Sequence, residues 1–304
     1  MSSPDPAAPA LPYQLQMVDA GDGYRVPLFW HAAAQPRANI VLMAALGVAA
    51  RFYLPLAQDL CAAGLNVALV EQRGHGESGL RPSRRTDFGF RHALLHDIPA
   101  VLDHVGNTAP GLPLYLMGHS LGGHYAAITA GRLPHRVDGV IVAACGTPWI
   151  GAFRGRIRSQ LKLLVRLVPA LNLLLGYYPG DRVGFGGREA RTLMADWRDL
   201  AIDNRYRARG LDEDLEAGIA RYRGPVLSLR MADDTYAPEA AMTAVTDKFI
   251  AGRVTRRLLT ADDLGDRADH FRWARSPSAV TREVSAWLAG PAPDGSGPGP
   301  GAAP

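Results

Sequence analysis

The stretch Leu114-Tyr-Leu-Met-Gly-His-Ser-Leu-Gly-Gly123 decides how the rest of the chain is organised. Its first four residues form a short apolar run, which is typical of a buried parallel strand. Gly118-His-Ser-Leu-Gly122 then fits G-x-S-x-G, a pattern in which serine occupies a strained turn between a strand and a helix. A Cβ at Gly118 or Gly122 would collide with the backbone that crowds such a turn. The stretch therefore predicts an exposed Ser120 hydroxyl at the edge of a sheet.

Apolar runs alternate with segments of helical spacing on both sides of this stretch. The runs that favour strands are 13–18, 24–31, 39–46, 66–70, 114–117, 137–145, 226–231 and 254–260. Helical spacing covers 52–63, 90–105, 122–132, 239–250 and 278–288. The alternation predicts an α/β fold with a mostly parallel sheet, helices on both faces and a hairpin leading in at one edge.

The segment 147–223 interrupts the alternation and shows no obvious strand. It contains a basic, amphipathic helix that starts at Ile157 and is expected to end at Pro169, then the apolar run 171–175 and a second helix over 188–202. Its position after a strand predicts a helical cap over the site. An ordinary packed excursion and a helix lying on a membrane are the alternatives. We favour a cap over membrane contact, because a lid must bury its apolar face against something.

The amino-acid composition limits which classes of protein this chain can belong to. The chain is 47% apolar and 20% charged, as in an ordinary globular protein. Its formal charge is +4, and nearly all of its basic residues are arginine. No block of like charge suggests nucleic acid as a partner. Cys61 and Cys145 fall in apolar runs and predict buried thiols, which favours a cytoplasmic location. The ends, 1–12 and 290–304, are rich in Pro, Ala and Gly and predict a disordered leader and tail around a domain at 13–289.

A nucleophilic serine needs an acid and a base, and both follow later strands. Asp233 and Asp234 come directly after the predicted strand 226–231, and Asp234 is preferred because Asp-x-x-x-Pro lets Pro238 start the next helix. His270 follows the last predicted strand, which gives the chain order Ser…Asp…His. His270 would take the Ser120 proton, and Asp234 would orient the imidazole.

An oxyanion needs two backbone N–H donors. One is predicted at Leu121, directly after the serine, and the other at Val48, after the strand that begins at Asn39. Arg73, in a glycine-rich turn, is expected to hold structure and not substrate. His92 and His96 have helical i, i+4 spacing, but no further ligand cluster accompanies them, so no metal and no cofactor are predicted.

Together with Arg73-Gly-His-Gly-Glu-Ser78, these residues resemble the α/β-hydrolase superfamily from about residue 13 to 289. The chain is similar to the serine aminopeptidase and monoglyceride-lipase-like branch. It is more similar still to a bacterial group known as predicted α/β-hydrolases, through residues 47–53, 177–187 and 196–197. The resemblance implies an eight-stranded sheet and a serine hydrolase mechanism, but no particular substrate. Many relatives have His-Gly before the oxyanion residue, where this chain has Leu46-Gly47.

The sequence thus predicts a serine hydrolase that cleaves a small or medium acyl ester through an acyl-enzyme. Thioesterase, peptidase and acyltransferase chemistry would use the same residues. A ligand-binding protein that has lost turnover is the alternative from another class, because fold does not fix function. The predicted partner is a small acyl substrate, and the sequence does not set the oligomeric state.

Overall fold

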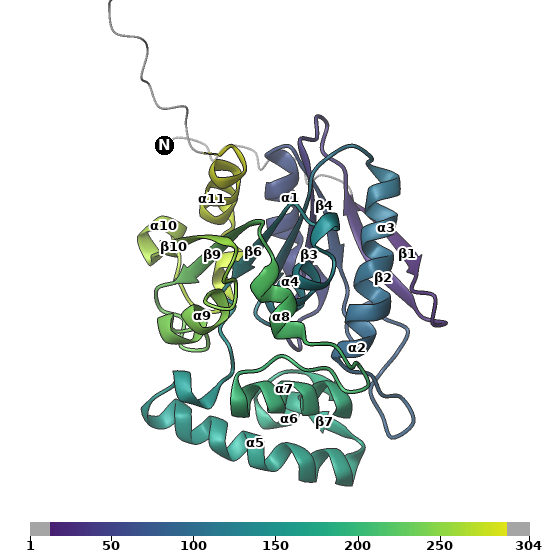
Figure 1. Cartoon of the computed structure of the whole chain (residues 1–304), viewed down its shortest axis with the longest axis vertical. Coiled ribbons are helices and arrows are strands. Elements are labelled where there is room, and N and C mark those ends of the chain that lie inside the picture. Colours follow the sequence, from purple (N-terminus) through teal and green to yellow (C-terminus); the bar gives the residue numbers. More distant parts are fainter. Residues whose placement is uncertain (1–12, 291–304) are drawn as a thin grey trace, which may run out of the picture.

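Eight strands form one sheet, in the order β1-β2-β4-β3-β5-β6-β9-β10 (Figure 1). The computed structural model describes residues 13–290, so the predicted leader at 1–12 and the tail beyond Gly290 lie outside the described residues. β1 pairs antiparallel with β2 and β2 with β4, and every other neighbouring pair is parallel. The strands are β1 (Gln14–Asp19), β2 (Arg25–His31), β3 (Ala38–Met43), β4 (Leu65–Val70), β5 (Leu114–His119), β6 (Gly139–Ala143), β9 (Pro225–Met231) and β10 (Arg253–Leu259).

Helices cover both faces of this sheet and bury two apolar clusters against it. One cluster packs the sheet against α3, α4 and α8, and the other packs it against α1 and α11. The mostly parallel sheet with helices on both faces, predicted from the alternating pattern, is confirmed. The helices of this frame are α1 (Leu54–Ala62), α2 (Phe90–His92), α3 (Ile98–Thr108), α4 (Leu121–Arg132), α8 (Leu215–Arg221), α9 (Glu239–Thr246), α10 (Ala261–Leu264) and α11 (Ser278–Leu288). A π-helical turn at Ala93–Asp97 joins α2 to α3, and short 3₁₀ turns cover Ala50–Tyr53, Pro134–Arg136, Ile150–Ala152 and Arg272–Ala274.

The parallel register brings the carboxyl ends of the central strands to one edge. Met43 of β3 pairs with Gly118 of β5, and His119 pairs with Ala143 of β6, which in turn pairs with Leu229 of β9. The loops that leave these strands therefore start side by side, at the edge where ligands bind in sheets of this kind.

Most of the segment between β6 and β9 gathers at this end of the sheet, below it in Figure 1. It consists of α5 (Gly155–Leu175), β7 (Tyr177–Pro179), α6 (Gly180–Val183), β8 (Arg188–Ala190) and α7 (Arg191–Asp203), followed by α8. The sequence of this segment shows no obvious strand, but the structure contains two, β7 and β8, which pair antiparallel. Each spans three residues, too few for an alternating pattern to emerge in the sequence.

The helix expected to end at Pro169 continues through that residue to Leu175. Proline has no N–H, so it leaves the carbonyl oxygen four residues earlier without its intrahelical donor. That oxygen belongs to Val165, and Nε of Arg198 on α7 donates to it at 2.8 Å. The neighbouring helix therefore supplies the hydrogen bond that Pro169 cannot make. Among the described helices, none combines the length and the apolar content needed to cross a membrane.

Candidate active site

Ser120 occupies the sharp turn between β5 and α4. Its backbone has φ 50° and ψ −115°, a conformation that L residues rarely adopt and that persists only where the surroundings impose it. A Cβ at Gly118 would lie 2.1 Å from the carbonyl carbon of Gly122, and one at Gly122 would lie 2.2 Å from the carbonyl oxygen of Met43. The predicted need for glycine on both sides of the serine is therefore confirmed.

Asp234 and His270 meet at the same edge of the sheet. Oδ2 of Asp234 lies 2.7 Å from Nδ1 of His270, and Oδ1 accepts the N–H groups of Tyr236 and Ala237 at 2.8 and 2.9 Å. Asp234 is buried, whereas Asp233 is exposed. The structure thus brings Asp234, and not Asp233, to the histidine.

Aromatic side chains hold His270 in place. Nε1 of Trp273 donates to the His270 carbonyl oxygen at 2.8 Å. The rings of His119, Phe271 and Tyr236 pack around the imidazole, with centroids 4.6, 4.8 and 5.2 Å away. Since Nδ1 faces the carboxylate, Nε2 is the nitrogen left to exchange a proton with a substrate or a nucleophile.

Ser120 and His270 line one pocket, with a volume of about 510 Å³. The segment 147–223, which we call the cap, supplies most of its wall. Three aromatic side chains of this segment are part of the wall: Phe153, Phe185 and Trp197. No Asp, Glu, Lys or Arg side chain of the described residues lines it. The pocket therefore suits an uncharged, apolar group beside the serine.

The loop after β3 carries the predicted oxyanion donor, but its geometry differs from the expectation. The N–H of Val48 donates to the Ala45 carbonyl oxygen at 3.2 Å, and the Val48 side chain packs away from the pocket, in the cluster with α1 and α11. Leu46 lines the pocket instead. Its N–H has no hydrogen-bond acceptor among residues 13–290. The direction of each N–H in a tight turn depends on local backbone torsions, and no motif in the sequence encodes them.

Three side chains order this loop, which has no His-Gly pair. Nε2 of Gln72 donates to the Ala44 carbonyl oxygen at 2.5 Å. The N–H of Ala45 donates to the Tyr53 hydroxyl at 3.0 Å. Further on, the N–H of Ala50 donates to Oε1 of Glu71 at 2.9 Å. These contacts hold the loop in place without a histidine at position 46.

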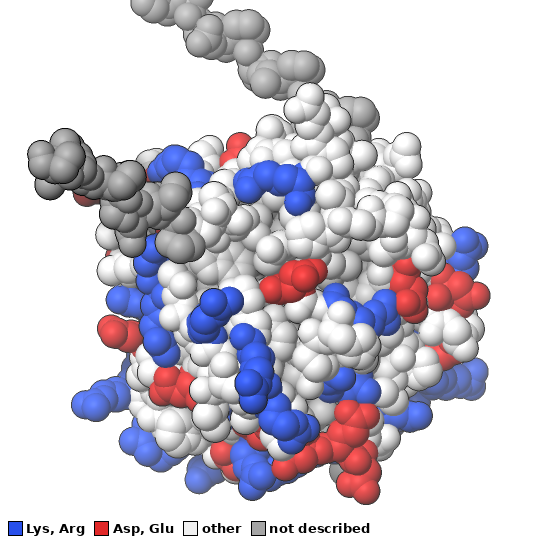
Figure 2. Space-filling view, turned by 45° about the horizontal axis from the view of Figure 1, so that its top comes forward, with Lys and Arg blue, Asp and Glu red and all other residues white. Residues whose placement is uncertain are grey.

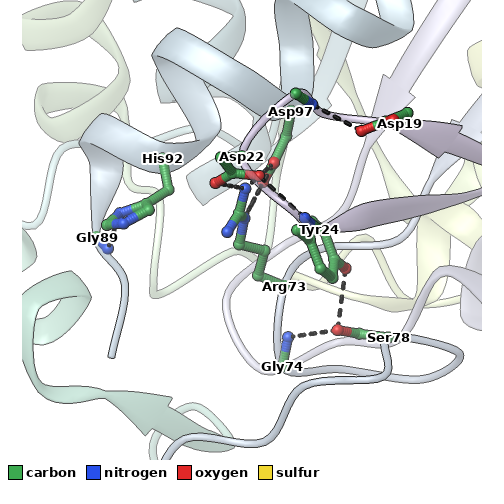
Figure 3. Close-up of polar contacts among 10 residues, drawn as sticks. Asp19, Asp22, Tyr24, Arg73, Gly74, Ser78, Gly89, His92 and Asp97 are labelled. Carbon is green, nitrogen blue, oxygen red and sulfur yellow. Dashed lines mark hydrogen bonds and ion pairs between the residues drawn. The ribbon is translucent and has the colours of Figure 1, made fainter. Parts of the chain in front are cut away.

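Arg73 lies in a buried ionic cluster outside the pocket (Figure 3). Its guanidinium donates to both carboxylate oxygens of Asp97, at 2.6 and 2.8 Å, and to Asp22 at 2.7 Å, and it stacks on the ring of Tyr24 at 4.3 Å. The Tyr24 hydroxyl donates to Ser78, which accepts the Gly74 N–H, so the whole turn is anchored. Arg73 therefore holds structure, as expected.

The His92 side chain also makes a local hydrogen bond: its Nδ1 accepts the N–H of Gly89 at 3.1 Å (Figure 3). Within residues 13–290, no group of three or more His, Cys, Asp or Glu side chains is arranged to hold a metal ion.

The cap contacts the core beside the oxyanion loop. Nε2 of His75 lies 3.1 Å from Oε2 of Glu189 on β8, whose Oε1 accepts the Gly187 N–H at 2.8 Å. Burial lowers the pKa of His75, but the hydrogen bond and charge of Glu189 outweigh it, and the pKa lies above the ordinary value. A Cβ at Gly47 would lie 2.3 Å from the nitrogen of Gly187, so the two backbones touch.

Known proteins resemble this chain in sequence and in fold. A family model described as serine aminopeptidase, S33, matches residues 34–250. Human monoglyceride lipase is 31% identical over 143 residues, 46% of each chain, and monoacylglycerol lipase of Mycolicibacterium smegmatis is 28% identical over 145 residues, 47% of this chain and 50% of that one. The chain thus spans about half the length of the curated relatives it matches.

A solved esterase from Exiguobacterium antarcticum superposes with a TM-score of 0.60 at 17% identity, over 91% of this chain and all of that one. At that identity the likeness shows the fold, which is that of the α/β-hydrolases.

Proposed function

Because the chain belongs to the serine aminopeptidase S33 family, we propose that it is a serine hydrolase with Ser120 as its nucleophile. The observation that carries the proposal is the 2.7 Å contact between His270 and Asp234 at a pocket that Ser120 also lines. In this assignment, Nε2 of His270 takes the Ser120 proton while Oγ attacks the substrate carbonyl carbon. The imidazolium then gives the proton to the leaving alcohol as the acyl-enzyme forms, and a water molecule repeats the sequence to release the acid.

We assign the oxyanion donors to the N–H groups of Leu121 and Leu46. Leu121 is the first residue of α4, so its N–H has no carbonyl oxygen one turn earlier in the helix to donate to. Leu46 replaces Val48 in this role because it lines the pocket, whereas the Val48 N–H already donates within the turn. Preorganised donors of this kind stabilise the charge that develops in the transition state.

The pocket favours an uncharged acyl ester over a peptide with a free amino terminus. An ammonium group moved into an apolar pocket without a carboxylate would lose its hydration with no compensating partner. The described residues place no carboxylate in the lining. We therefore do not propose an aminopeptidase substrate, although the family is described as serine aminopeptidase. The names of the lipase relatives agree with an ester substrate. A cytoplasmic location stays a prediction.

The first experiment is labelling of the purified protein with a fluorophosphonate, beside Ser120→Ala and His270→Ala. Labelling of the wild type alone, together with hydrolysis of p-nitrophenyl esters that improves from acetate to octanoate, is the expected result. Faster hydrolysis of an amino-acid anilide than of any ester would contradict the substrate class. A folded wild type that neither reacts nor hydrolyses would favour the binding-protein alternative.

A further inference from the structure

Helix α5 exposes a stripe of apolar side chains to solvent. Leu163, Leu167, Ala170 and Leu174 follow the spacing i, i+4, i+7, i+11, which places them on one side of the helix. Leu163, Leu167 and Leu174 are 57, 45 and 66% exposed, and the adjoining Leu173 is 79% exposed. Only Val165 and Val168 of the whole helix are buried. The premise that favoured a cap over membrane contact, that the lid buries its apolar face, is therefore wrong for this side of α5.

A basic stripe runs beside the apolar one. Arg158, Lys162 and Arg166 follow the spacing i, i+4, i+8, and all three side chains are exposed. Residues 155–175 contain no Asp or Glu. No carboxylate of residues 13–290 lies within salt-bridge distance of these three cations. On the face shown in Figure 2, by contrast, basic and acidic side chains are interspersed.

The exposed surface of α5 is continuous with the mouth of the pocket. Leu163 and Leu167 line the pocket that contains Ser120, although both are well exposed. Val183 of α6 also lines it and is 48% exposed. Figure 1 places α5 at the outer end of the molecule, on the side of the cap away from the sheet. A flat partner seated on α5 would therefore face the pocket entrance.

We propose that α5 docks on a lipid bilayer that contains anionic lipid, with its apolar stripe among the acyl chains and its basic stripe at the headgroups. A helix with one apolar side, a basic flank and no acid suits the plane of a membrane interface. A second copy of the chain is the less suitable occupant, because a two-fold contact would bring two uncompensated basic stripes together. The proposal concerns binding and is independent of the proposed catalytic activity.

The test measures sedimentation with phosphatidylcholine vesicles, alone or with about one third phosphatidylglycerol. The protein carries Ser120→Ala, so that no vesicle lipid is consumed. We expect it to bind the anionic vesicles, and Leu173→Asp with Leu174→Asp to weaken that binding at least tenfold. These two leucines do not line the pocket. Arg158→Gln with Lys162→Gln and Arg166→Gln should remove the preference for anionic vesicles and its dependence on salt.

Two matched controls lie away from α5. Ile250→Asp changes an apolar side chain that is as exposed as Leu173, at 79%, and Arg282→Gln removes an exposed charge on α11; both should bind like the parent. Thermal unfolding of each variant reports whether it folds. The proposal is overturned if the parent protein does not sediment with anionic vesicles, or if Ile250→Asp weakens binding as much as the leucine variant. It is also overturned if the parent is a dimer that the leucine variant dissociates while vesicle binding stays the same.

Discussion

The hydroxyl oxygen of Tyr53 lies 2.7 Å from Nδ1 of His119 and also accepts the N–H of Ala45. One side chain therefore connects the loop after β3 to the residue that precedes Ser120. Burial raises the pKa of Tyr53 and lowers that of His119 well below its ordinary value, so both groups stay neutral. The phenol then donates to the imidazole while it accepts from the backbone.

Replacing Tyr53 by phenylalanine should lower kcat about tenfold and leave KM nearly unchanged, because the loop that holds the proposed Leu46 donor loses its anchor. The free energy of unfolding should fall by about 1–3 kcal/mol, since two buried polar groups lose their partner. Steady-state kinetics and urea denaturation measure the two effects. Tyr222→Phe is the control: its hydroxyl donates to the Val137 carbonyl oxygen far along the chain from this loop. An equal drop in kcat in that variant would contradict the positioning role.

Asp234→Asn should reduce kcat/KM by about 10³–10⁴-fold, because an amide cannot hold the imidazole in the required tautomer or stabilise its charged form. Asp233→Asn removes a carboxylate of the same size that is exposed beside it, and it should leave activity within about twofold of the wild type. The comparison uses p-nitrophenyl esters at one mildly alkaline pH for both variants and the wild type. If Asp233→Asn is the damaging change, the assignment of the acid is wrong.

Gly47→Ala should weaken the contact between the cap and the core. Gly47 has φ +77°, so alanine there incurs a backbone cost of about 1–2 kcal/mol, and its Cβ would also overlap the backbone of Gly187. Gly21 has the same φ, but nothing lies within 4 Å of its Cβ position, so Gly21→Ala isolates the backbone cost. We expect Gly47→Ala to be less stable than that control by about 1–3 kcal/mol and to expose the cap to limited proteolysis. Equal stability of the two variants would contradict the prediction, because the loops of Gly47 and Gly187 would then move apart with no loss in the free energy of unfolding.

The pair His75–Glu189 should make the attachment of the cap dependent on pH. The pKa of His75 is raised in the folded chain, so the pair contributes its full stability below the unfolded value of about 6.5 and loses it as pH rises through the folded value. His75→Gln should therefore lower the free energy of unfolding by about 1–2 kcal/mol at acidic pH and less at alkaline pH. Denaturation at several pH values measures this, with the exposed His135→Gln as control. A deficit that grows with pH would have the wrong sign.

Arg198 and Pro169 should be thermodynamically coupled through the Val165 carbonyl oxygen. Arg198→Met leaves that oxygen without a donor and should cost about 1 kcal/mol in the wild type. Pro169→Ala restores the intrahelical N–H and should stabilise the chain by about 1–3 kcal/mol. In the Pro169→Ala background, Arg198→Met should then cost less. A double-mutant cycle by urea denaturation gives the coupling, and strict additivity would contradict it.

The sequence predicted the sheet and the helices that cover it, because each strand and turn has a local sequence pattern. The buried strand 139–143 is a continuous apolar run, and a Cβ on either glycine beside Ser120 would overlap the backbone. The cap was less predictable. β7 and β8 are too short to show a period, and the course of α5 through Pro169 depends on an arginine 29 residues further on. Contacts of that kind have no local signature.

In the candidate site, too, some residues could be predicted from the sequence and others could not. Chain order and turn chemistry singled out Ser120, Asp234 and His270, and the structure brings the last two together at the pocket that Ser120 lines. The choice between Val48 and Leu46 depends on which backbone N–H a turn leaves unpaired, and residue identity does not determine that. The catalytic roles of Ser120, Asp234 and His270 and the oxyanion role of Leu46 stay predictions until the variants are measured.

The origin of the pocket walls has a consequence for how such proteins diversify. The proposed reacting groups come from loops of the sheet, whereas the walls come mainly from one continuous segment between β6 and β9. Substitutions or exchange of that single segment can change which molecules enter without disturbing the groups that act on them. Selectivity and chemistry can therefore evolve at separate rates within one chain.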